Sequence, residues 1–465
     1  MSRLEAALGD VARGKLPAHV LLVTVLAFAA LAKAADVTSA PENSRLEATL
    51  RQWPQWRGPL GTGVAPAGEP PTEWNESSGK GIRWKVELPG RGHSTPAVWD
   101  DRVYLTAAAP FGEAVGPFES KAPGAHDNAA VTHRQRFIVM SLDRKDGKIV
   151  WQQVVREALP DEAGHRTASL ASASPVTDGE MVIASFGSYG LYAFLRDGSH
   201  VWKRDLGRYQ SLHGHGEGSS PVLRGDLLIV NWDHEGQSFL AALDRRTGAE
   251  RWKTLRNEIT SWATPIVVDH AGKTQVIVSG TNRVRGYDLA TGEVIWECGG
   301  LSANVVASPV AADGWVFAGS SYDRRALLAI QLDGARGDIT GSDRVGWSRF
   351  RGTPYVPSPL LSGDALYFLT HYQGIISRVD AKSGKDAPGA VRLDGIEDVY
   401  ASPVAAAGRV YVTDLDGTTV VLRDSDTPVI LARNQLDDVF SASAAIAGRE
   451  LFLRGARKLY CLASD

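Results

Sequence analysis

The chain contains very little cysteine and no apolar run long enough to cross a membrane. Its 465 residues include only 2 Cys, and these two, Cys298 and Cys461, lie far apart in the sequence. Two separated thiols can form neither a disulfide framework nor a cysteine-based zinc site, so we expect two buried free thiols. The most apolar stretch, residues 20–31, is shorter than the roughly 20 residues that a transmembrane helix needs.

Neither sign of charge predominates. The chain has 50 basic and 53 acidic residues and a formal net charge of -3, with both signs interspersed along the sequence. This pattern creates no strong field for nucleic acid or an anionic membrane, and we expect no nucleic-acid partner. Hydrophobic residues make up 43% of the chain, which is typical of a soluble globular protein.

The first 34 residues have the pattern of an export signal. Basic residues precede the apolar run, and Ala32 and Ala34 fit the small-x-small rule for signal-peptidase cleavage. We therefore expect a periplasmic or secreted protein. The alternative is an uncleaved signal that anchors the chain in the membrane, because the charged leader is long. No cysteine lies near the cleavage site, so we expect no lipid anchor.

A short phrase recurs along the rest of the chain. It contains a Ser-Pro or Thr-Pro pair, a turn and an alternating apolar strand, as in STPAVWDDRVYLT at residues 94–106. After a first interval of 79 residues the phrase recurs every 41 to 50 residues. A period of about 44 residues is typical of a four-stranded propeller blade. The repeated position is occupied by Pro96, Pro175, Pro221, Pro265, Pro309, Pro359, Pro403 and, in the weakest copy, Ala444.

A second phrase ends most of the repeats. It reads LDRRTGAERW at residues 243–252, where Asp, Thr and Gly predict a tight turn and Trp252 begins the next strand. We expect the large indole rings to wedge between neighbouring blades. The tryptophans at this position are Trp151, Trp202, Trp252, Trp296 and Trp347, and two later repeats lack one.

These repeats predict an all-β fold, a single eight-bladed β-propeller of four-stranded antiparallel blades. Residues 82–90 form a strand that carries Trp84 in the position of the blade-ending tryptophans, yet this strand precedes the first Ser-Pro phrase. An N-terminal strand that completes the last blade would close the ring and protect the sheet edges. We expect an extended lead-in over residues 35–73, a monomeric propeller over 74–465, and a loop insertion at about 107–136.

The two phrases together resemble the PQQ-like (pyrrolo-quinoline quinone) propeller repeat. This repeat is shared by quinoprotein alcohol dehydrogenases and by BamB-type periplasmic propeller proteins of outer-membrane assembly. The resemblance implies the fold strongly, but it implies two different functions, because the repeat serves both enzymes and non-catalytic scaffolds. For a dehydrogenase it implies PQQ over a tryptophan floor, a bound cation, an aspartate base and often an adjacent cysteine pair, and this chain has no adjacent cysteines.

One polar cluster is a candidate metal site. Alternate residues of an extended segment share a face, so the side chains of SLHGHGEGSSP at residues 211–221 can point the same way. Imidazole and carboxylate groups are ligands for zinc, copper or iron. The alternative is that these groups satisfy backbone atoms in a Gly-rich loop. The candidate ligands are His213, His215, Glu217, Asp233 and His234.

A second set of residues is a candidate binding surface at the channel. Aromatic and arginine side chains fall where the connections between strands should face the channel, and such residues are typical of contact surfaces between proteins. Packing between blades is the alternative. These residues are Trp262, Tyr322, Arg324, Arg351, Tyr355, His371 and Tyr372.

The sequence therefore favours an exported, non-catalytic propeller that binds an envelope protein or peptide, with no assigned catalytic residue or cofactor. The alternative is an oxidoreductase that depends on PQQ or on a metal ion. A third hypothesis, a carbohydrate or small-ligand sensor, rests only on the channel aromatics.

Overall fold

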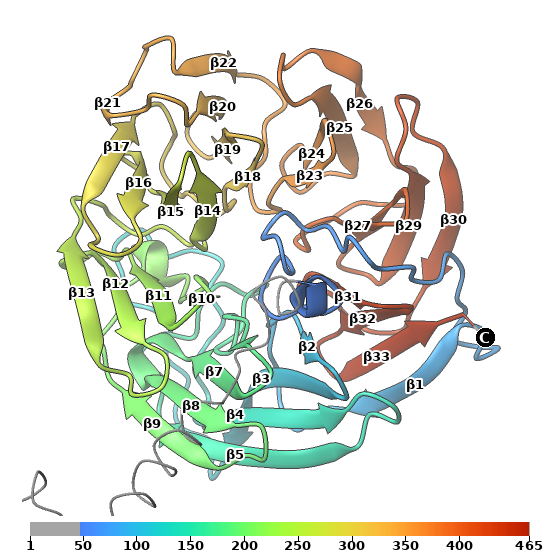
Figure 1. Cartoon of the computed structure of the whole chain (residues 1–465). Coiled ribbons are helices and arrows are strands. Elements are labelled where there is room, and N and C mark those ends of the chain that lie inside the picture. Colours follow the sequence, from blue (N-terminus) through green and yellow to red (C-terminus); the bar gives the residue numbers. More distant parts are fainter. Residues whose placement is uncertain (1–46, 465) are drawn as a thin grey trace, which may run out of the picture. The chain divides into compact units, whose positions relative to one another are not determined.

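Eight sheets stand around a central axis in the computed structural model, which describes residues 47–464 (Figure 1). The predicted signal segment and residues 35–46 of the expected lead-in lie outside the described residues. The first four sheets are the blades β2 (Ala97–Trp99), β3 (Arg102–Phe111), β4 (Arg134–Asp143), β5 (Ile149–Ala158); β6 (Val176–Thr177), β7 (Met181–Ser185), β8 (Leu191–Leu195), β9 (His200–Arg204); β10 (Val222–Arg224), β11 (Leu227–Trp232), β12 (Phe239–Asp244), β13 (Glu250–Leu255); and β14 (Ile266–His270), β15 (Lys273–Ser279), β16 (Val284–Asp288), β17 (Val294–Cys298).

The remaining sheets continue this order as blades 5 to 8. They are β18 (Val310–Ala312), β19 (Trp315–Ser320), β20 (Ala326–Gln331), β22 (Val345–Arg349); β23 (Leu360–Ser362), β24 (Ala365–Leu369), β25 (Ile375–Asp380), β26 (Asp386–Arg392); β27 (Val404–Ala406), β28 (Arg409–Thr413), β29 (Thr418–Arg423), β30 (Ile430–Gln435); and β31 (Ala445–Ala447), β32 (Glu450–Arg454), β33 (Lys458–Ala463) with β1 (Ile82–Glu87). The predicted eight-bladed all-β fold is confirmed.

The ring closes through an N-terminal strand, as the sequence predicted. Strand β1 pairs antiparallel with β33, so the outermost strand of blade 8 comes from the start of the propeller and its other strands from the end. Trp84 lies opposite Cys461 in this pairing. Both predicted free thiols are buried, and burial raises the pKa of Cys298 to about 11.

The Ser-Pro phrase joins neighbouring blades at the centre of the ring. In blades 1 to 7 the Ser or Thr before the repeated position donates its backbone N–H to the hydroxyl of the next blade, at 2.8 to 3.0 Å. The Thr95 hydroxyl closes the circle by donating to the Ser443 carbonyl at 3.0 Å. We call this set the hydroxyl ring; its members are Thr95, Ser174, Ser220, Thr264, Ser308, Ser358, Ser402 and Ser443.

The blade-ending tryptophans wedge between blades as predicted. In five blades the indole N–H donates to a backbone carbonyl of the next blade at 2.8 to 2.9 Å. Each of these rings covers the glycine of the next Asp-x-x-Thr-Gly-type turn, where an added Cβ would lie 2.5 to 2.8 Å from the indole. This contact therefore requires both a tryptophan at the end of one blade and a glycine in the turn of the next blade. The pairs are Trp84 with Gly147, Trp151 with Gly198, Trp202 with Gly248, Trp252 with Gly292, and Trp347 with Gly384.

Blade 4 departs from this pattern. Its Trp296 is fully buried but donates to Gln275 Oε1 of its own sheet, at 2.9 Å. The connection that follows β20 is longer than in other blades, and its short strand β21 (Gly337–Asp338) pairs in parallel with β17. This fifth strand covers the edge of blade 4 and accounts for the wider spacing between Pro309 and Pro359.

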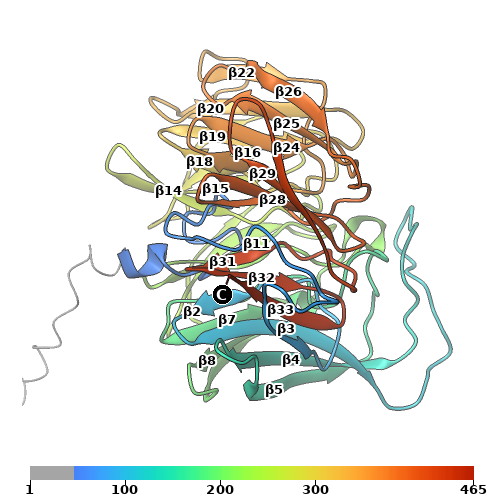
Figure 2. The same cartoon turned by 90° about the vertical axis from the view of Figure 1, so that its right-hand side faces the viewer.

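The insertion in blade 1 begins and ends as part of a long hairpin. Strand β3 extends through Phe111 and β4 begins at Arg134, so the part without regular strands is 112–133 rather than the expected 107–136. The Arg136 guanidinium lies 4.6 Å from the Phe111 ring centroid and covers the hairpin end. Figure 2 shows this hairpin and its loop projecting beyond the other blades.

The lead-in packs against the propeller from Trp53 onward. Trp53 is fully buried and bridges to Val98 of blade 1, and Ala65 donates its N–H to the Ala405 carbonyl of blade 7. Further on, the backbone N–H of the buried Trp74 donates to Asn434 Oδ1 on β30 at 2.8 Å. The lead-in therefore covers blade 7, one of the two repeats that lack a wedge tryptophan. None of the helices within residues 47–464 is long and apolar enough to span a membrane.

The wedge contact predicts a specific cost for Gly248. Its φ is +68° and a Cβ would lie 2.8 Å from the Trp202 ring, whereas Gly225 has a φ of +57° and open space around it. Gly225→Ala should cost about 1 kcal/mol through backbone strain alone. Gly248→Ala should cost a further 1–3 kcal/mol or so through the clash. Denaturant unfolding of the two variants checks this, and equal costs would contradict the wedge.

Candidate functional site

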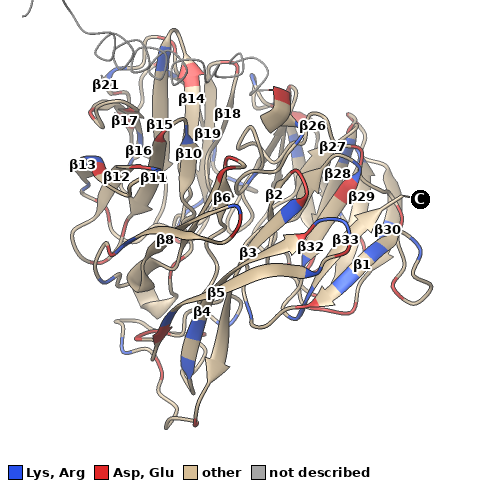
Figure 3. Cartoon of the chain, turned by 60° about the horizontal axis from the view of Figure 1, so that its bottom comes forward, with Lys and Arg blue, Asp and Glu red and all other residues tan. Residues whose placement is uncertain are grey.

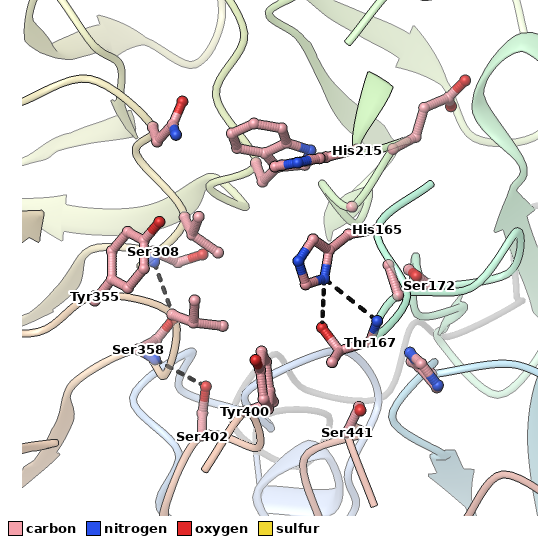
Figure 4. Close-up of a pocket in the computed structure, with 18 of the residues that line it drawn as sticks. His165, Thr167, Ser172, His215, Ser308, Tyr355, Ser358, Tyr400, Ser402 and Ser441 are labelled. Carbon is pink, nitrogen blue, oxygen red and sulfur yellow. Dashed lines mark hydrogen bonds between the residues drawn. The ribbon is translucent and has the colours of Figure 1, made fainter. Parts of the chain in front are cut away.

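Two sets of connections meet at one end of the propeller: those between successive blades and those between the second and third strands of a blade. They surround a central cavity of about 300 Å³. Figure 4 shows side chains from several blades pointing toward an open centre, among them His165, His215, Tyr355 and Tyr400. Figure 3 shows basic and acidic residues interspersed over the strands, so the fold does not gather one sign of charge.

The repeat itself positions two tiers of the lining. Residues one and three places before the repeated position share a face of the extended chain, and that face points to the channel. The first tier is the hydroxyl ring, and Figure 4 shows its bonds from Ser308 to Ser358 and from Ser358 to Ser402. The second tier lies entirely in the cavity lining: His93, Ser172, Gly218, Trp262, Val306, Val356, Tyr400 and Ser441.

The lead-in supplies the floor. Trp56 lines the cavity, and the neighbouring Arg57 is 2% exposed. Arg57 donates to the carbonyls of Pro359 and Pro403 at 2.6 Å and of Thr62 at 3.0 Å. Burial lowers the pKa of Arg57 to about 9. One buried arginine therefore ties the lead-in to blades 6 and 7 beneath the cavity.

Aromatic side chains form the walls. Tyr355 and Tyr372 lie edge to face with ring centroids 5.3 Å apart, and Tyr372 stacks on Tyr400 at 5.1 Å. Burial raises the pKa of all three hydroxyls, which therefore stay protonated at neutral pH. Elsewhere in the lining Trp262 donates its indole N–H to the Gly216 carbonyl at 2.7 Å and lies 6.2 Å from the His215 ring.

Histidines from three connections meet beside Trp262. The ring of His126, from the blade 1 insertion, lies 4.9 Å from His213 and 4.8 Å from His215, and His165 lies 4.9 Å from His215. Burial lowers the pKa of His215 to about 4 and also lowers that of His165. His215 and His165 are therefore neutral at pH 7.

The predicted metal ligands do not converge on one point. His213 and His215 are neighbours, with ring centroids 5.4 Å apart, but Glu217 accepts hydrogen bonds from the Ser188 N–H and hydroxyl at 2.8 and 2.9 Å. Asp233 is fully buried against Arg256, and His234 stacks on Tyr209. Within residues 47–464 no group of three or more His, Cys, Asp or Glu side chains is placed to hold a metal ion.

Most of the predicted binding residues do gather at the cavity. Trp262, Tyr322, Tyr355 and Tyr372 line it, and His371 stacks on Tyr355 with centroids 5.0 Å apart. Besides His371, two predicted residues lie outside the lining: the Arg324 guanidinium donates to the Leu301 carbonyl at 2.7 Å, and Arg351 is exposed at the surface. The sequence reasoning missed Trp56, His93, His126, His165, Asn304 and Tyr400. His93 and Tyr400 stand three places before the repeated position, so inspection of that position in every repeat could have identified both.

The comparisons with known proteins identify the class of the chain. A family model described as outer membrane protein assembly factor BamB matches residues 70–231 and 236–464. The chain therefore belongs to this family of PQQ-like propeller proteins. No curated protein matches it.

Solved structures share the fold at low sequence identity. BamB from Moraxella catarrhalis is 17% identical with a TM-score of 0.53, over 75% of this chain and 99% of that chain. The computationally designed protein Ika8 is 11% identical with a TM-score of 0.53, over 82% and 99%. Quinohemoprotein alcohol dehydrogenase from Comamonas testosteroni is 14% identical with a TM-score of 0.49, over 92% and 83%. The first two similarities bear on the fold alone.

The cavity does not fit the quinone cofactor of the dehydrogenases. PQQ carries several carboxylates, but none of the described residues that line the cavity is a lysine or an arginine. The residues that the structure describes also provide no cluster for the accompanying cation. Both thiols are buried in different blades and cannot form the adjacent pair found in many of those enzymes.

This mismatch predicts the outcome of a cofactor titration. PQQ added to the full chain, with and without calcium, should produce no saturable quenching of tryptophan fluorescence, because its carboxylates find no cationic partner in the cavity. Trp56 and Trp262 line the cavity and serve as the reporters. Saturable, calcium-dependent quenching would instead support the oxidoreductase hypothesis.

His93 predicts how stability depends on pH. Burial, with Arg454 and Arg91 nearby, lowers the pKa of His93 from 6.5 to about 3. The unfolded chain therefore binds this proton near pH 6.5 and the folded chain does not, so stability falls as the pH drops from about 6.5 toward 3. Because His93 is partly exposed, we expect a loss of about 1–2 kcal/mol at pH 4.5.

The measurement compares denaturant unfolding at pH 7 and pH 4.5. His93→Asn should reduce the loss of stability at the lower pH, whereas His200→Asn, an exposed histidine on β9, should leave it as in the parent chain. An unchanged pH dependence in His93→Asn would show that other groups control acid stability.

Proposed function

We propose that this chain is an exported, non-catalytic scaffold that holds an extended segment of an envelope protein across the mouth of its central cavity. The observation that carries the proposal is a set of exposed aromatic and arginine side chains in two connections of blade 5, of which Tyr322 reaches the cavity lining. We call this set the mouth patch; it consists of Tyr322, Arg324, Arg325, Phe350 and Arg351.

The mouth patch has the composition of a protein contact surface. Phe350 is 62% exposed and Tyr322 45% exposed, so both large side chains offer apolar area that a partner could bury. Aromatic residues and arginine are enriched in protein interfaces because they bury much area and donate several hydrogen bonds. Tyr322 also stacks over Tyr355, with centroids 6.2 Å apart, so the patch continues into the cavity wall.

Family membership supports a partner in the envelope. The matching family model is named for an outer membrane protein assembly factor. The leader at residues 1–34 has the composition of an export signal, which supports export to the cell envelope. The oxidoreductase alternative is not favoured, because the cavity fits neither its quinone nor its cation.

Photo-cross-linking in cells tests the proposal. The full chain, expressed in a bacterial host with an outer membrane, carries a photoreactive phenylalanine at position 322 or, as the control, at position 429. Val429 is 41% exposed and lies in the turn between β29 and β30. Cross-links to defined envelope proteins are expected from position 322 only.

A second variant makes the result specific. Phe350→Ser with Arg351→Glu removes apolar area and reverses one charge without touching the cavity, so it should reduce the cross-links from position 322 severalfold. Melting curves confirm that the variant remains folded. Equal cross-linking at both positions, or no effect of the double variant, would refute a partner at the mouth.

A further inference from the structure

The hydroxyl ring presents unused donors to the cavity. Six of its members line the cavity, and each accepts one backbone N–H through its hydroxyl oxygen. Within residues 47–464 none of these six hydroxyl groups donates its own hydrogen to a protein acceptor. A hydroxyl that accepts can still donate, so the wall carries donors that require an acceptor from outside the protein. The six are Ser220, Thr264, Ser308, Ser358, Ser402 and Ser443.

A matching acceptor lies at the cavity wall. Asn304 is 3% exposed, lines the cavity and has an Oδ1 atom without a hydrogen-bond partner. Its φ of +54° lies in the left-handed region, which asparagine adopts more readily than most residues do. The cavity therefore offers both donors and an acceptor.

Aromatic faces border the same space. Trp262 and Tyr400 project from the second tier, and Tyr355 and Tyr372 extend the wall between blades 5 and 7. Figure 4 shows the Tyr355 and Tyr400 rings and the His215 side chain around the open centre. Such faces attract the slightly positive C–H groups of a ligand, and the volume of about 300 Å³ is at the lower end of small-molecule sites.

The charges of the lining residues favour a neutral ligand. No lysine or arginine is among the described lining residues, so an anion finds no counter-charge there. The two lining carboxylates are already engaged: Asp127 pairs with Arg166 at 3.0 Å, and Glu217 is held by Ser188. The imidazoles of His93 and His215 are neutral, because burial lowers the pKa of each.

We propose that the central cavity is a carbohydrate-binding site that takes one neutral sugar unit of a saccharide. The C–H face of the sugar lies on Trp262, its ring and hydroxyl oxygens accept from the hydroxyl ring, and one of its hydroxyls donates to Asn304. A sugar satisfies all three features at once, because it combines apolar faces with edges that both donate and accept. This activity does not depend on a protein partner, and of the mouth-patch residues only Tyr322 lines the cavity.

Isothermal titration of the full chain with named probes tests the proposal. The probes are three neutral disaccharides, cellobiose, maltose and N,N′-diacetylchitobiose, with choline as a cation and citrate as an anion for comparison. We expect at least one disaccharide to bind saturably with a Kd below about 10 mM, and neither ion to bind. No disaccharide binding, or tighter binding of choline or citrate, would overturn the proposal.

Variants at Trp262 locate the binding. Trp262→Leu and Trp262→Phe both remove the indole hydrogen bond to Gly216, but only the leucine removes the aromatic face. Trp262→Leu should weaken disaccharide binding about tenfold or more, and Trp262→Phe should retain most of the affinity. Phe350→Ala, an exposed aromatic outside the lining, serves as the matched control and should bind as the parent does.

The outcomes separate this proposal from the scaffold function. Melting curves first confirm that each variant is folded. Equal affinity in Trp262→Leu and the parent chain would place the saccharide elsewhere and overturn the cavity assignment. Loss of cross-linking in the mouth-patch variant with unchanged disaccharide binding would support both functions as separate properties of one face.

Discussion

The structure depends on the hydrogen bonds of the hydroxyl ring, in which blades 1 to 7 each donate a backbone N–H to the hydroxyl of the next blade. The donor is the backbone N–H of the Ser or Thr before the repeated position, at the inner end of a blade, where no sheet partner satisfies it. A buried N–H without an acceptor costs about 1–3 kcal/mol, so the neighbouring hydroxyl must lie within bonding distance. The bonds from Thr95 around to Ser443 fix the spacing of all eight blades at the axis.

Away from the axis, neighbouring blades are held together by the tryptophan wedges and not by the hydroxyl ring. The indole rings cover the turn glycines of the next blade, and the two blades that lack a wedge tryptophan use other groups. Between blades 6 and 7, Asp424 accepts hydrogen bonds from Ser362 and Tyr367 at 2.6 and 2.5 Å. Over blade 7 the lead-in contributes Trp74. The ring is therefore uniform at its axis and variable at its rim, which lets the repeats diverge.

The architecture could be predicted from the sequence because the repeat length, the Gly-containing turn and the blade-ending tryptophan are local patterns that recur many times. Blade number, strand order and closure by β1 all follow from those patterns. The site was predicted only in part. Trp262, Tyr322, Tyr355 and Tyr372 were found as aromatic residues in connections, but the proposed metal set fails to converge, because Asp233 pairs with a distant Arg256 that no local pattern reveals. His126 and Trp56 reach the cavity through an insertion and a lead-in, whose paths no repeat determines.

The same constraint that builds the ring also explains why the fold does not reveal the activity. Every repeat of this chain supplies a Ser or Thr hydroxyl one place before the repeated position, so this tier is nearly the same in all eight blades. The residue two places earlier makes no such bond and is free to vary: Gly218 and Ser172 leave space on one side, while Trp262 and Tyr400 fill it elsewhere. Specificity in this propeller is therefore expected to reside in the second tier and in the connections above it, where side chains differ from blade to blade.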